Sequence, residues 1–284
     1  MARKALLVGI NDYAPVGPGG PDLRGCVNDV KDMAHTLNVL NIVPPAPGSV
    51  KILTDERATR AAILDGLKWL VTNAKKGDVL VFHYSGHGSQ VADLSGDEID
   101  KKDETICPHD FRTAGMITDD DLRKIISGLA SGANLDVFLD SCHSGTGTRE
   151  LSILAEAPEE LSLTPRYVEP PVDVGFFLDA NPSIPVRGIF KPSTGEKEAV
   201  EVPGLNHVLW AGCRSNQTSS EGSIQGVYRG VFTYTFCKAL RRAGTSIARK
   251  RLDAIVSADI KKLGYAQIPQ LEGTRSSLGE KVFT

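Results

Sequence analysis

Two short segments of the sequence combine glycine with side chains that can do acid–base or nucleophilic chemistry. His87 lies in Tyr-Ser-Gly-His-Gly at 84–88, and Cys142 lies in Asp-Ser-Cys-His-Ser-Gly at 140–145. A thiol with an ordinary pKa of about 8.5 is mostly protonated at neutral pH, and an imidazole close in space can remove its proton. Polar residues flank Cys142 on both sides, which is unusual for a core cysteine. The two segments therefore predict a cysteine nucleophile with a histidine partner.

The other histidines and cysteines suggest no metal site. His83 and His87 have the spacing of a helical metal pair, but Gly86 and Gly88 make a helix there improbable, so we reject zinc. We expect His83 to be a core residue, His143 to bond local backbone, and the remaining histidines to be structural: His35, His109 and His207. Five cysteines without a C-x-x-C pair predict neither a disulfide framework nor a structural zinc.

Both candidate segments directly follow an apolar run, at 79–84 and 135–140, that predicts a buried strand. Similar runs predict strands at 5–10 and 50–53, and apolar residues at helical spacing predict helices over 27–40, 59–74 (with Thr59 as N-cap) and 119–130. This alternation predicts an α/β fold with an open, mostly parallel sheet and helices on both faces. Ligands of such sheets bind at the carboxyl ends of the strands, where both segments lie.

The second half of the chain is less regular. Residues 146–206 are rich in proline and predict an irregular insertion, with room for a hairpin. A strand at 207–211 and helices near 230–242 and 247–263 follow. We therefore predict a single domain over 1–284, made of a part with the catalytic pair (1–145), the insertion (146–206) and a smaller part (207–284).

Composition excludes several classes of function. The 284 residues carry a formal net charge of −3, which argues against a nucleic-acid surface. The sequence has no apolar run of membrane-spanning length. The apolar run near its N-terminus is too short for a signal peptide, so we expect a cytoplasmic protein with no membrane partner. It also lacks the glycine-rich motifs that bind nucleotides.

Four segments, in order along the chain, resemble the motifs of one family. The segments at 84–88 and 140–145 are similar to the two catalytic motifs of metacaspases, which are caspase-like cysteine peptidases. Residues 23–30 resemble the family's N-terminal motif, and Gln-Thr-Ser at 217–219 resembles its C-terminal substrate loop. The short chain looks most like the bacterial members, called orthocaspases, and the resemblance implies a caspase-like fold and a monomer.

The resemblance also implies roles for individual residues. His87 would be the general acid/base and Cys142 the nucleophile, which forms a thioester with the substrate. The backbone N–H groups of Gly88 and Cys142 would form the oxyanion hole. The S1 pocket, which holds the residue before the cleaved bond (P1), would be lined by Cys26, Asp29, Ser85 and Asp140.

The pocket assignment has physical support as well. Alternate residues of an extended segment face the same side, so Asp140 faces the side of Cys142, and Ser85 that of His87. A carboxylate there repels an acidic P1 side chain and attracts a basic one, and Arg can pair with it through two nitrogens. We therefore expect protein or peptide substrates cut after Arg, then Lys. The alternatives are that Asp29 is a solvated helix residue and that Asp140 positions a neighbouring backbone amide.

We expect no required cofactor; calcium is the one candidate metal, and the sequence gives arguments for and against it. Calcium-dependent metacaspases use acids that look equivalent to Asp103, Asp119 and Asp120, in an acidic stretch over 93–121. Their further acid falls on Arg149 here, and a cation opposes calcium binding. Asp119 can instead cap the helix that begins there.

Arg149 is also a candidate for self-cleavage, because it lies seven residues past Cys142 at the start of the insertion. Arg166 and Arg187 are alternatives, and Arg149 can equally be a surface residue or an internal cation in the acidic site. Three rival functions remain open at this point: a catalytically silent interaction module, a related peptidase of legumain or CHAT type with another P1 specificity, and a small-molecule acyl transferase.

Overall fold

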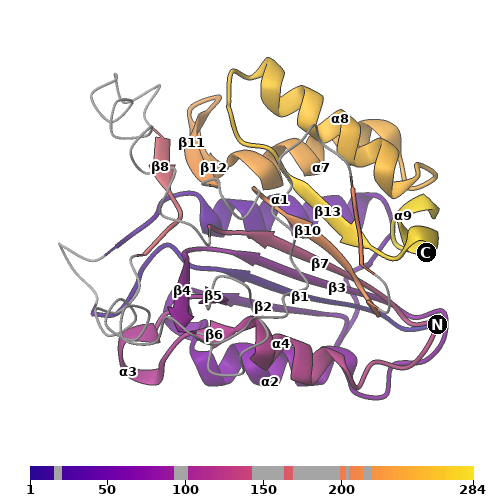
Figure 1. Ribbon diagram of the computed structural model, residues 1–284, viewed down its shortest axis with the longest axis horizontal. Helices are drawn as coiled ribbons and strands as arrows, with labels where there is room; N and C mark the ends of the chain where they lie inside the picture. Colours follow the sequence, from indigo (N-terminus) through magenta and orange to yellow (C-terminus); the bar gives the residue numbers. More distant parts are fainter. Residues whose placement is uncertain (16–20, 93–101, 143–162, 169–198, 203–204, 214–218) are drawn as a thin grey trace, which may run out of the picture.

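A computed structural model describes residues 1–284 except 16–20, 93–101, 143–162, 169–198, 203–204 and 214–218 (Figure 1). Its centre is a seven-stranded sheet. From one edge to the other the strands are β2 (Val50–Thr54), β1 (Arg3–Gly9), β3 (Val79–Ser85), β7 (Asn134–Asp140), β10 (Val208–Ala211), β13 (Gln270–Gly273) and β9 (Val200–Glu201). All neighbours are parallel except β10 and β13, so the predicted mostly parallel sheet is confirmed.

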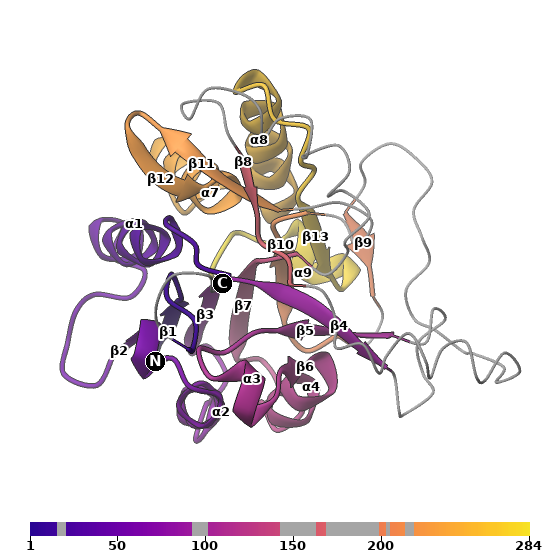
Figure 2. The same ribbon diagram turned by 90° about the vertical axis from the view of Figure 1, so that its left-hand side faces the viewer.

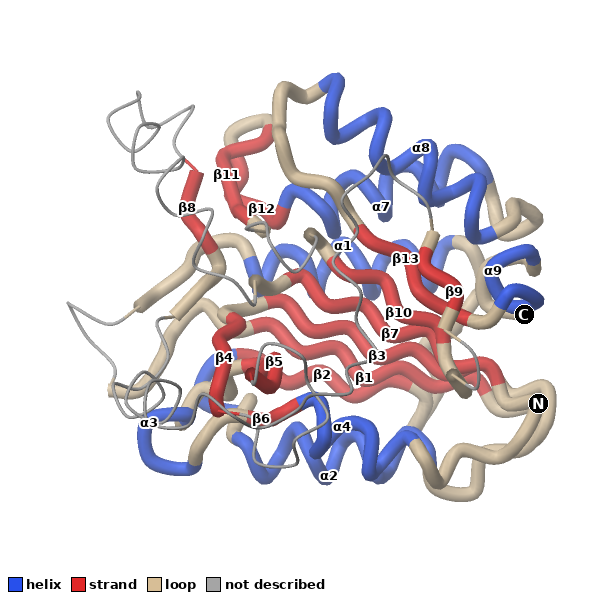
Figure 3. Tube along the Cα trace, in the orientation of Figure 1, coloured by secondary structure: helices blue, strands red, loops and turns tan. Residues whose placement is uncertain are grey.

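Helices cover both faces of this sheet, as the alternation along the sequence predicts (Figure 3). Helices α1 (Cys26–Val39), α7 (Val231–Ala243) and α8 (Arg249–Lys262) lie on one face, and α2 (Arg60–Val71) and α4 (Asp119–Ile126) lie on the other. Strand β1 shows why: Ala5 and Leu7 pack with the first group, whereas Leu6 and Val8 pack with the second. The Thr59 hydroxyl accepts a hydrogen bond from the Ala62 N–H at 3.2 Å, so the predicted N-cap of α2 is present.

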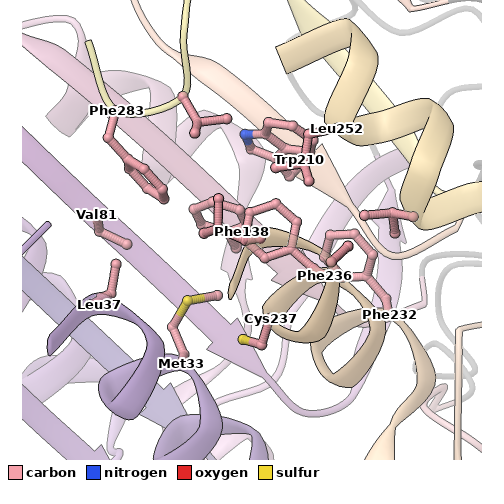
Figure 4. Packing of buried hydrophobic residues seen from close by; sticks show 14 of the residues in the cluster. Met33, Leu37, Val81, Phe138, Trp210, Phe232, Phe236, Cys237, Leu252 and Phe283 are labelled. Carbon is pink, nitrogen blue, oxygen red and sulfur yellow. The ribbon is translucent and has the colours of Figure 1, made fainter. Parts of the chain in front are cut away.

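Aromatic rings lie at the centre of the core on the face covered by α1, α7 and α8 (Figure 4). Phe138 of β7 lies 5.8 Å from the Trp210 ring and 4.7 Å from the Phe236 ring, and the last two rings are 5.1 Å apart. Trp210 comes from β10 and Phe236 from α7, so this contact joins strands on both sides of the 146–206 insertion in one core.

Two small sheets and several short elements were not predicted. One sheet has the order β4 (Gly88–Ala92), β5 (Lys102–Ile106), β6 (Ile117–Thr118), and the other has the order β12 (Val227–Gly230), β11 (Ser220–Ile224), β8 (Leu163–Pro165). The further short elements are η1 (Asp55–Arg57), α3 (Phe111–Ala114) and α9 (Arg275–Gly279). These strands are short and mixed in polarity, as Ser-Glu-Gly-Ser-Ile in β11 shows, so they carry no clear two-residue period.

The predicted helix over 119–130 ends earlier, at Ile126, and the described residues of the 146–206 insertion include β8 and β9. Within the part of the chain that the structure describes, no helix has the length and apolar character needed to cross a bilayer.

Candidate active site

The neighbouring strands β3 and β7 bring the two predicted catalytic segments together. Ser85 at the end of β3 lies opposite Asp140 at the end of β7, and the chain continues to His87 and Cys142 from these two positions. A methyl group at Gly88 would overlap the carbonyl oxygen of Cys142. The segments after the two strands are therefore in van der Waals contact, at the end of the molecule that faces the viewer in Figure 2.

His87 is held in one orientation through its Nε2 atom. Nε2 lies 2.5 Å from the carbonyl oxygen of Pro21, which can only accept, so Nε2 carries the proton. Nδ1 is buried and has no hydrogen-bond partner within the described residues. Burial lowers the pKa of His87 to about 4, although the carbonyls of Pro21 and Arg166 raise it. At neutral pH the ring is therefore uncharged, and Nδ1 is available as a base.

Cys142 is fully buried. Its Sγ donates to the carbonyl oxygen of Ser219 at 3.1 Å and lies 4.0 Å from the Sγ of Cys213. All five cysteines are buried thiols in the structure.

The pocket beside this pair is filled by a side chain of the protein itself. Arg166, which follows β8, is fully buried. Its Nη2 lies 2.7 Å from Asp29 Oδ2 and 3.3 Å from Glu221 Oε2. Its Nη1 donates to the Ser85 hydroxyl at 2.8 Å and lies 3.2 Å from Asp140 Oδ1. Three carboxylates thus surround one guanidinium, and each terminal nitrogen has its own acidic partners.

The backbone holds these carboxylates in place. The Gly230 N–H donates to Asp29, and the N–H and hydroxyl of Thr233, in the first turn of α7, donate to Asp140 Oδ2 at 3.0 and 2.7 Å. Asp140 therefore also positions a backbone amide, as the alternative reading of this residue expects. Burial raises the pKa of Asp29 to about 7, and the guanidinium of Arg166 opposes this rise.

Glu221 connects the pocket to the segment before α1. Its Oε1 accepts from the Arg24 N–H at 2.8 Å and its Oε2 from the Gly25 N–H at 2.9 Å, while Oε2 also faces Arg166. These two backbone hydrogen bonds fix the position of the Glu221 carboxylate, the third acid of the pocket.

The main chain of Arg166 is bound as firmly as its side chain. Its carbonyl oxygen accepts from the N–H groups of Gly88 and Cys142, at 3.0 and 3.1 Å. Its own N–H donates to the Ser219 carbonyl oxygen at 3.1 Å, and β8 continues this pairing antiparallel to β11. The two N–H groups predicted as an oxyanion hole thus converge on one oxygen, that of the residue in the acidic pocket.

The structure brings together most of the residues that the sequence singled out. His87, Gly88 and Cys142 surround the Arg166 carbonyl, and Asp29, Ser85 and Asp140 contact its guanidinium. Cys26, the first residue of α1, is fully buried beside them. Burial raises the pKa of its thiol, and the positive charge of Arg166 opposes this rise. Asp29 is buried, not solvated.

Sequence analysis missed Glu221 and Gly230, named Ser219 only as part of the substrate-loop motif, and did not place Arg166 in the pocket. A signal for Glu221 was present: it lies two residues after Ser219 of the Gln-Thr-Ser motif, on the same side of an extended segment. Gly230 had no such signal, yet only glycine fits there, because a methyl group would overlap the carboxylates of Asp29 and Asp140.

The remaining candidates lie elsewhere or outside the described residues. His83 is buried in β3 with Nε2 3.2 Å from the Thr233 hydroxyl, and the Nδ1 of His109 lies 2.7 Å from the carbonyl oxygen of Asp12. Asp119 and Asp120 each bind Arg123, at 2.7 and 2.6 Å. The described residues contain no cluster of three His, Cys, Asp or Glu side chains that could hold a metal ion. His143, Arg149, Arg187 and the side chain of Asp103 lie outside the described residues.

Comparisons with known proteins identify the family of the chain. Residues 3–149 match the family model of the metacaspase, peptidase C14 domain. Metacaspase-1A of Aspergillus oryzae is 36% identical over 295 residues, which cover 95% of this chain and 67% of that protein. Metacaspase-1 of Ajellomyces capsulatus is 35% identical over 295 residues, covering 95% of this chain and 79% of its own.

The crystal structure of protein GSU0716 from Geobacter sulfurreducens superimposes with a TM-score of 0.65 and 25% identity, covering 100% of this chain and 99% of that one. The fold, the family match and the curated relatives lead to one conclusion. The chain belongs to the metacaspase family and is a cysteine-type endopeptidase, a hydrolase of the peptidase C14 class.

Proposed function

We propose that the protein hydrolyses peptide bonds after arginine through a Cys142–His87 dyad. One observation carries this proposal: Arg166 has its guanidinium among three carboxylates while its carbonyl oxygen accepts from the Gly88 and Cys142 N–H groups. This is the position that a P1 residue must take before attack, because the acceptor oxygen becomes the oxyanion.

The chemistry follows from the protonation states of the pair. His87 Nδ1, the unprotonated nitrogen, takes the proton of the Cys142 thiol as Sγ attacks the P1 carbonyl carbon. The negative charge that develops on the oxygen is stabilised by the two N–H groups. The imidazolium then protonates the leaving amine, and water hydrolyses the resulting thioester with His87 again as base. The thiol proton, which points to Ser219 in this conformation, must first turn to His87.

A preference for Arg over Lys is the expected result of this pocket. The two terminal nitrogens of the guanidinium bind separately, Nη2 to Asp29 and Glu221 and Nη1 to Ser85 and Asp140. A lysine has one nitrogen and cannot occupy both positions at once. An acidic P1 side chain would meet three carboxylates and be rejected.

We propose self-processing at the Arg166–Tyr167 bond, in place of the bond after Arg149 that the sequence suggested. Arg166 occupies the acidic pocket of its own chain, and its carbonyl oxygen accepts from the Gly88 and Cys142 N–H groups. Because this peptide bond already lies in the active site of its own chain, its cleavage needs no second molecule. We therefore expect an intramolecular reaction whose rate constant is independent of protein concentration.

The test is a cleavage profile of peptides that carry the sequence of residues 160–172. The parent peptide should be cut between Arg and Tyr, its Lys version more slowly, and its Asp version not at all. The enzyme should be assayed after self-processing, with Cys142→Ala and a thiol-alkylating reagent as controls. A protein that leaves every peptide intact would instead be a silent interaction module.

We also propose that catalysis requires no calcium and that the enzyme acts as a monomer in the cytoplasm. Arg123 already pairs with both Asp119 and Asp120, and the monomer is what the resemblance of the motifs implies. The five cysteines are thiols and form no disulfide, which suits a reducing compartment. Activity should therefore survive a calcium chelator, and light scattering should give the mass of one chain. Loss of activity with the chelator, restored by calcium, would contradict the first of these.

A further inference from the structure

The hydrogen bonds that hold residues 166–168 continue past the Arg166–Tyr167 bond, on the side of the leaving amine. The Val168 N–H donates to the carbonyl oxygen of Gly88 at 3.0 Å, and the Gly88 N–H donates to the carbonyl oxygen of Arg166, also at 3.0 Å. These two bonds form a parallel bridge between Gly88 and Tyr167. Gly88 thus contacts the main chain on both sides of the Arg166–Tyr167 bond.

The ladder between β4 and β5 explains why both polar groups of Gly88 are available. Gly88 lies opposite Ile106, and the preceding residue, His87, accepts from the Cys107 N–H at 3.0 Å. Antiparallel strands alternate hydrogen-bonded and non-bonded pairs, so the N–H and C=O of Gly88 point away from β5. They face the edge of β4 along which residues 166–168 run.

The side chain of Val168 has a place as well. It is partly buried against the apolar cluster on the α2 and α4 face of the sheet, whereas Arg166 is fully buried in the acidic pocket. The residue two positions past the cleaved bond, P2′, therefore has both a main-chain partner and an apolar surface.

We propose that Gly88 is a prime-side binding site as well as an oxyanion donor, and that the enzyme recognises substrates through the P2′ amide N–H. This inference rests on the proposed function, since it extends the same bound segment. The preferred substrates are chains that continue at least two residues past the basic residue, with an apolar residue and a free N–H at P2′. Proline at P2′ lacks this donor and should be rejected.

Peptides that differ only in one donor test the proposal. The parent carries residues 160–172, and the variant replaces the amide N–H of Val168 by an ester oxygen. The control replaces the N–H of Ser162 instead, four residues before Arg166 in the sequence. We expect kcat/KM for cleavage after Arg to fall about two- to tenfold with the Val168 ester, the value of one hydrogen bond, and to stay unchanged with the control. A peptide with proline at Val168 should lose more, because its ring also meets the strand edge.

The chain itself provides a second measurement. Val168→Pro should slow self-cleavage strongly, whereas Val168→Ala, which keeps the N–H and loses only part of the apolar contact, should slow it less. Equal cleavage of the parent, the Val168 ester and the proline peptide would overturn the prime-side site and leave the proposed function standing. Failure to cut the parent peptide would overturn the proposed function and this inference with it.

Discussion

Asp29 and Arg166 form an ion pair of 2.7 Å across 137 residues of sequence, and neither side chain has any exposed surface. Breaking a buried pair by removing one partner is costly, because it leaves an uncompensated charge. In the proposed self-cleavage Arg166 would leave the pocket, and Asp29, Asp140 and Glu221 would lose their common cation. The emptied pocket would then bind the basic side chain of another substrate, so the proposed self-processing and the proposed specificity rest on the same three carboxylates.

Replacing Arg166 by Gln should abolish self-processing, because an amide has neither the positive charge nor the two terminal nitrogens that bind separate carboxylates. Arg166→Lys should retain slow processing, and Arg149→Gln should process at the wild-type rate. Intact-mass spectrometry of each protein, beside Cys142→Ala as the uncut reference, identifies the bond. Fragments ending at Arg149 in the Arg166→Gln protein would contradict this assignment.

The Glu221→Gln variant should reduce the preference for arginine. A hydrogen bond to a charged partner contributes about 1.5–3 kcal/mol, so kcat/KM for an Arg peptide should fall roughly tenfold or more. Cleavage of the Lys peptide should fall less, since one ammonium cannot engage both ends of the pocket. Glu280→Gln, whose carboxylate is half exposed, is the matched control. An unchanged Arg-to-Lys ratio would show that Glu221 only positions Arg24 and Gly25.

Gly88→Ala should lower kcat strongly. The added methyl would overlap the Cys142 carbonyl oxygen and displace the N–H that faces the P1 carbonyl. Loss of one oxyanion donor costs roughly 100- to 1,000-fold in kcat. Gly279→Ala serves as control because its methyl meets no atom within 4 Å. Circular dichroism should show both variants folded, and wild-type kcat in folded Gly88→Ala would argue against the oxyanion role.

The contribution of His83 to stability should fall as the pH is lowered from about 7 to 4, whereas the raised pKa of Asp29 acts in the opposite direction. Burial lowers the pKa of His83 from 6.5 to about 4, so the unfolded chain binds its proton first. This contribution is present above pH 6.5 and is progressively lost below it; at pH 5 the loss is about 2 kcal/mol.

Urea titrations of Cys142→Ala at pH 5 and 7.5 measure this change without self-cleavage. Adding His83→Gln should flatten the dependence, whatever it does to the absolute stability at pH 7.5. His87 shifts in the same direction, so some dependence should remain. If the double variant loses as much stability at pH 5 as Cys142→Ala alone, the pKa of His83 is not lowered by folding.

Local patterns were enough to predict the frame of the molecule. Apolar runs that alternate with helical spacing along the chain predicted a parallel sheet with helices on both faces, and Thr59 caps α2 as its position suggests. The segments around His87 and Cys142 come at strand ends because apolar runs stop there. These features depend on residues a few positions apart, where periodicity and capping act.

The occupant of the pocket and its third acid were decided by tertiary structure alone. Arg166 meets Asp29 and Glu221 across 137 and 55 residues, through segments whose short strands have no readable period. Gly230 matters only because two carboxylates converge on it. The sequence by itself determined a thiol and an imidazole at adjacent strand ends beside an acidic residue. Which arginine fills that site depended on the long-range pairing of β8 with β11, since such pairing is set by the packing of distant segments and not by local residue preference.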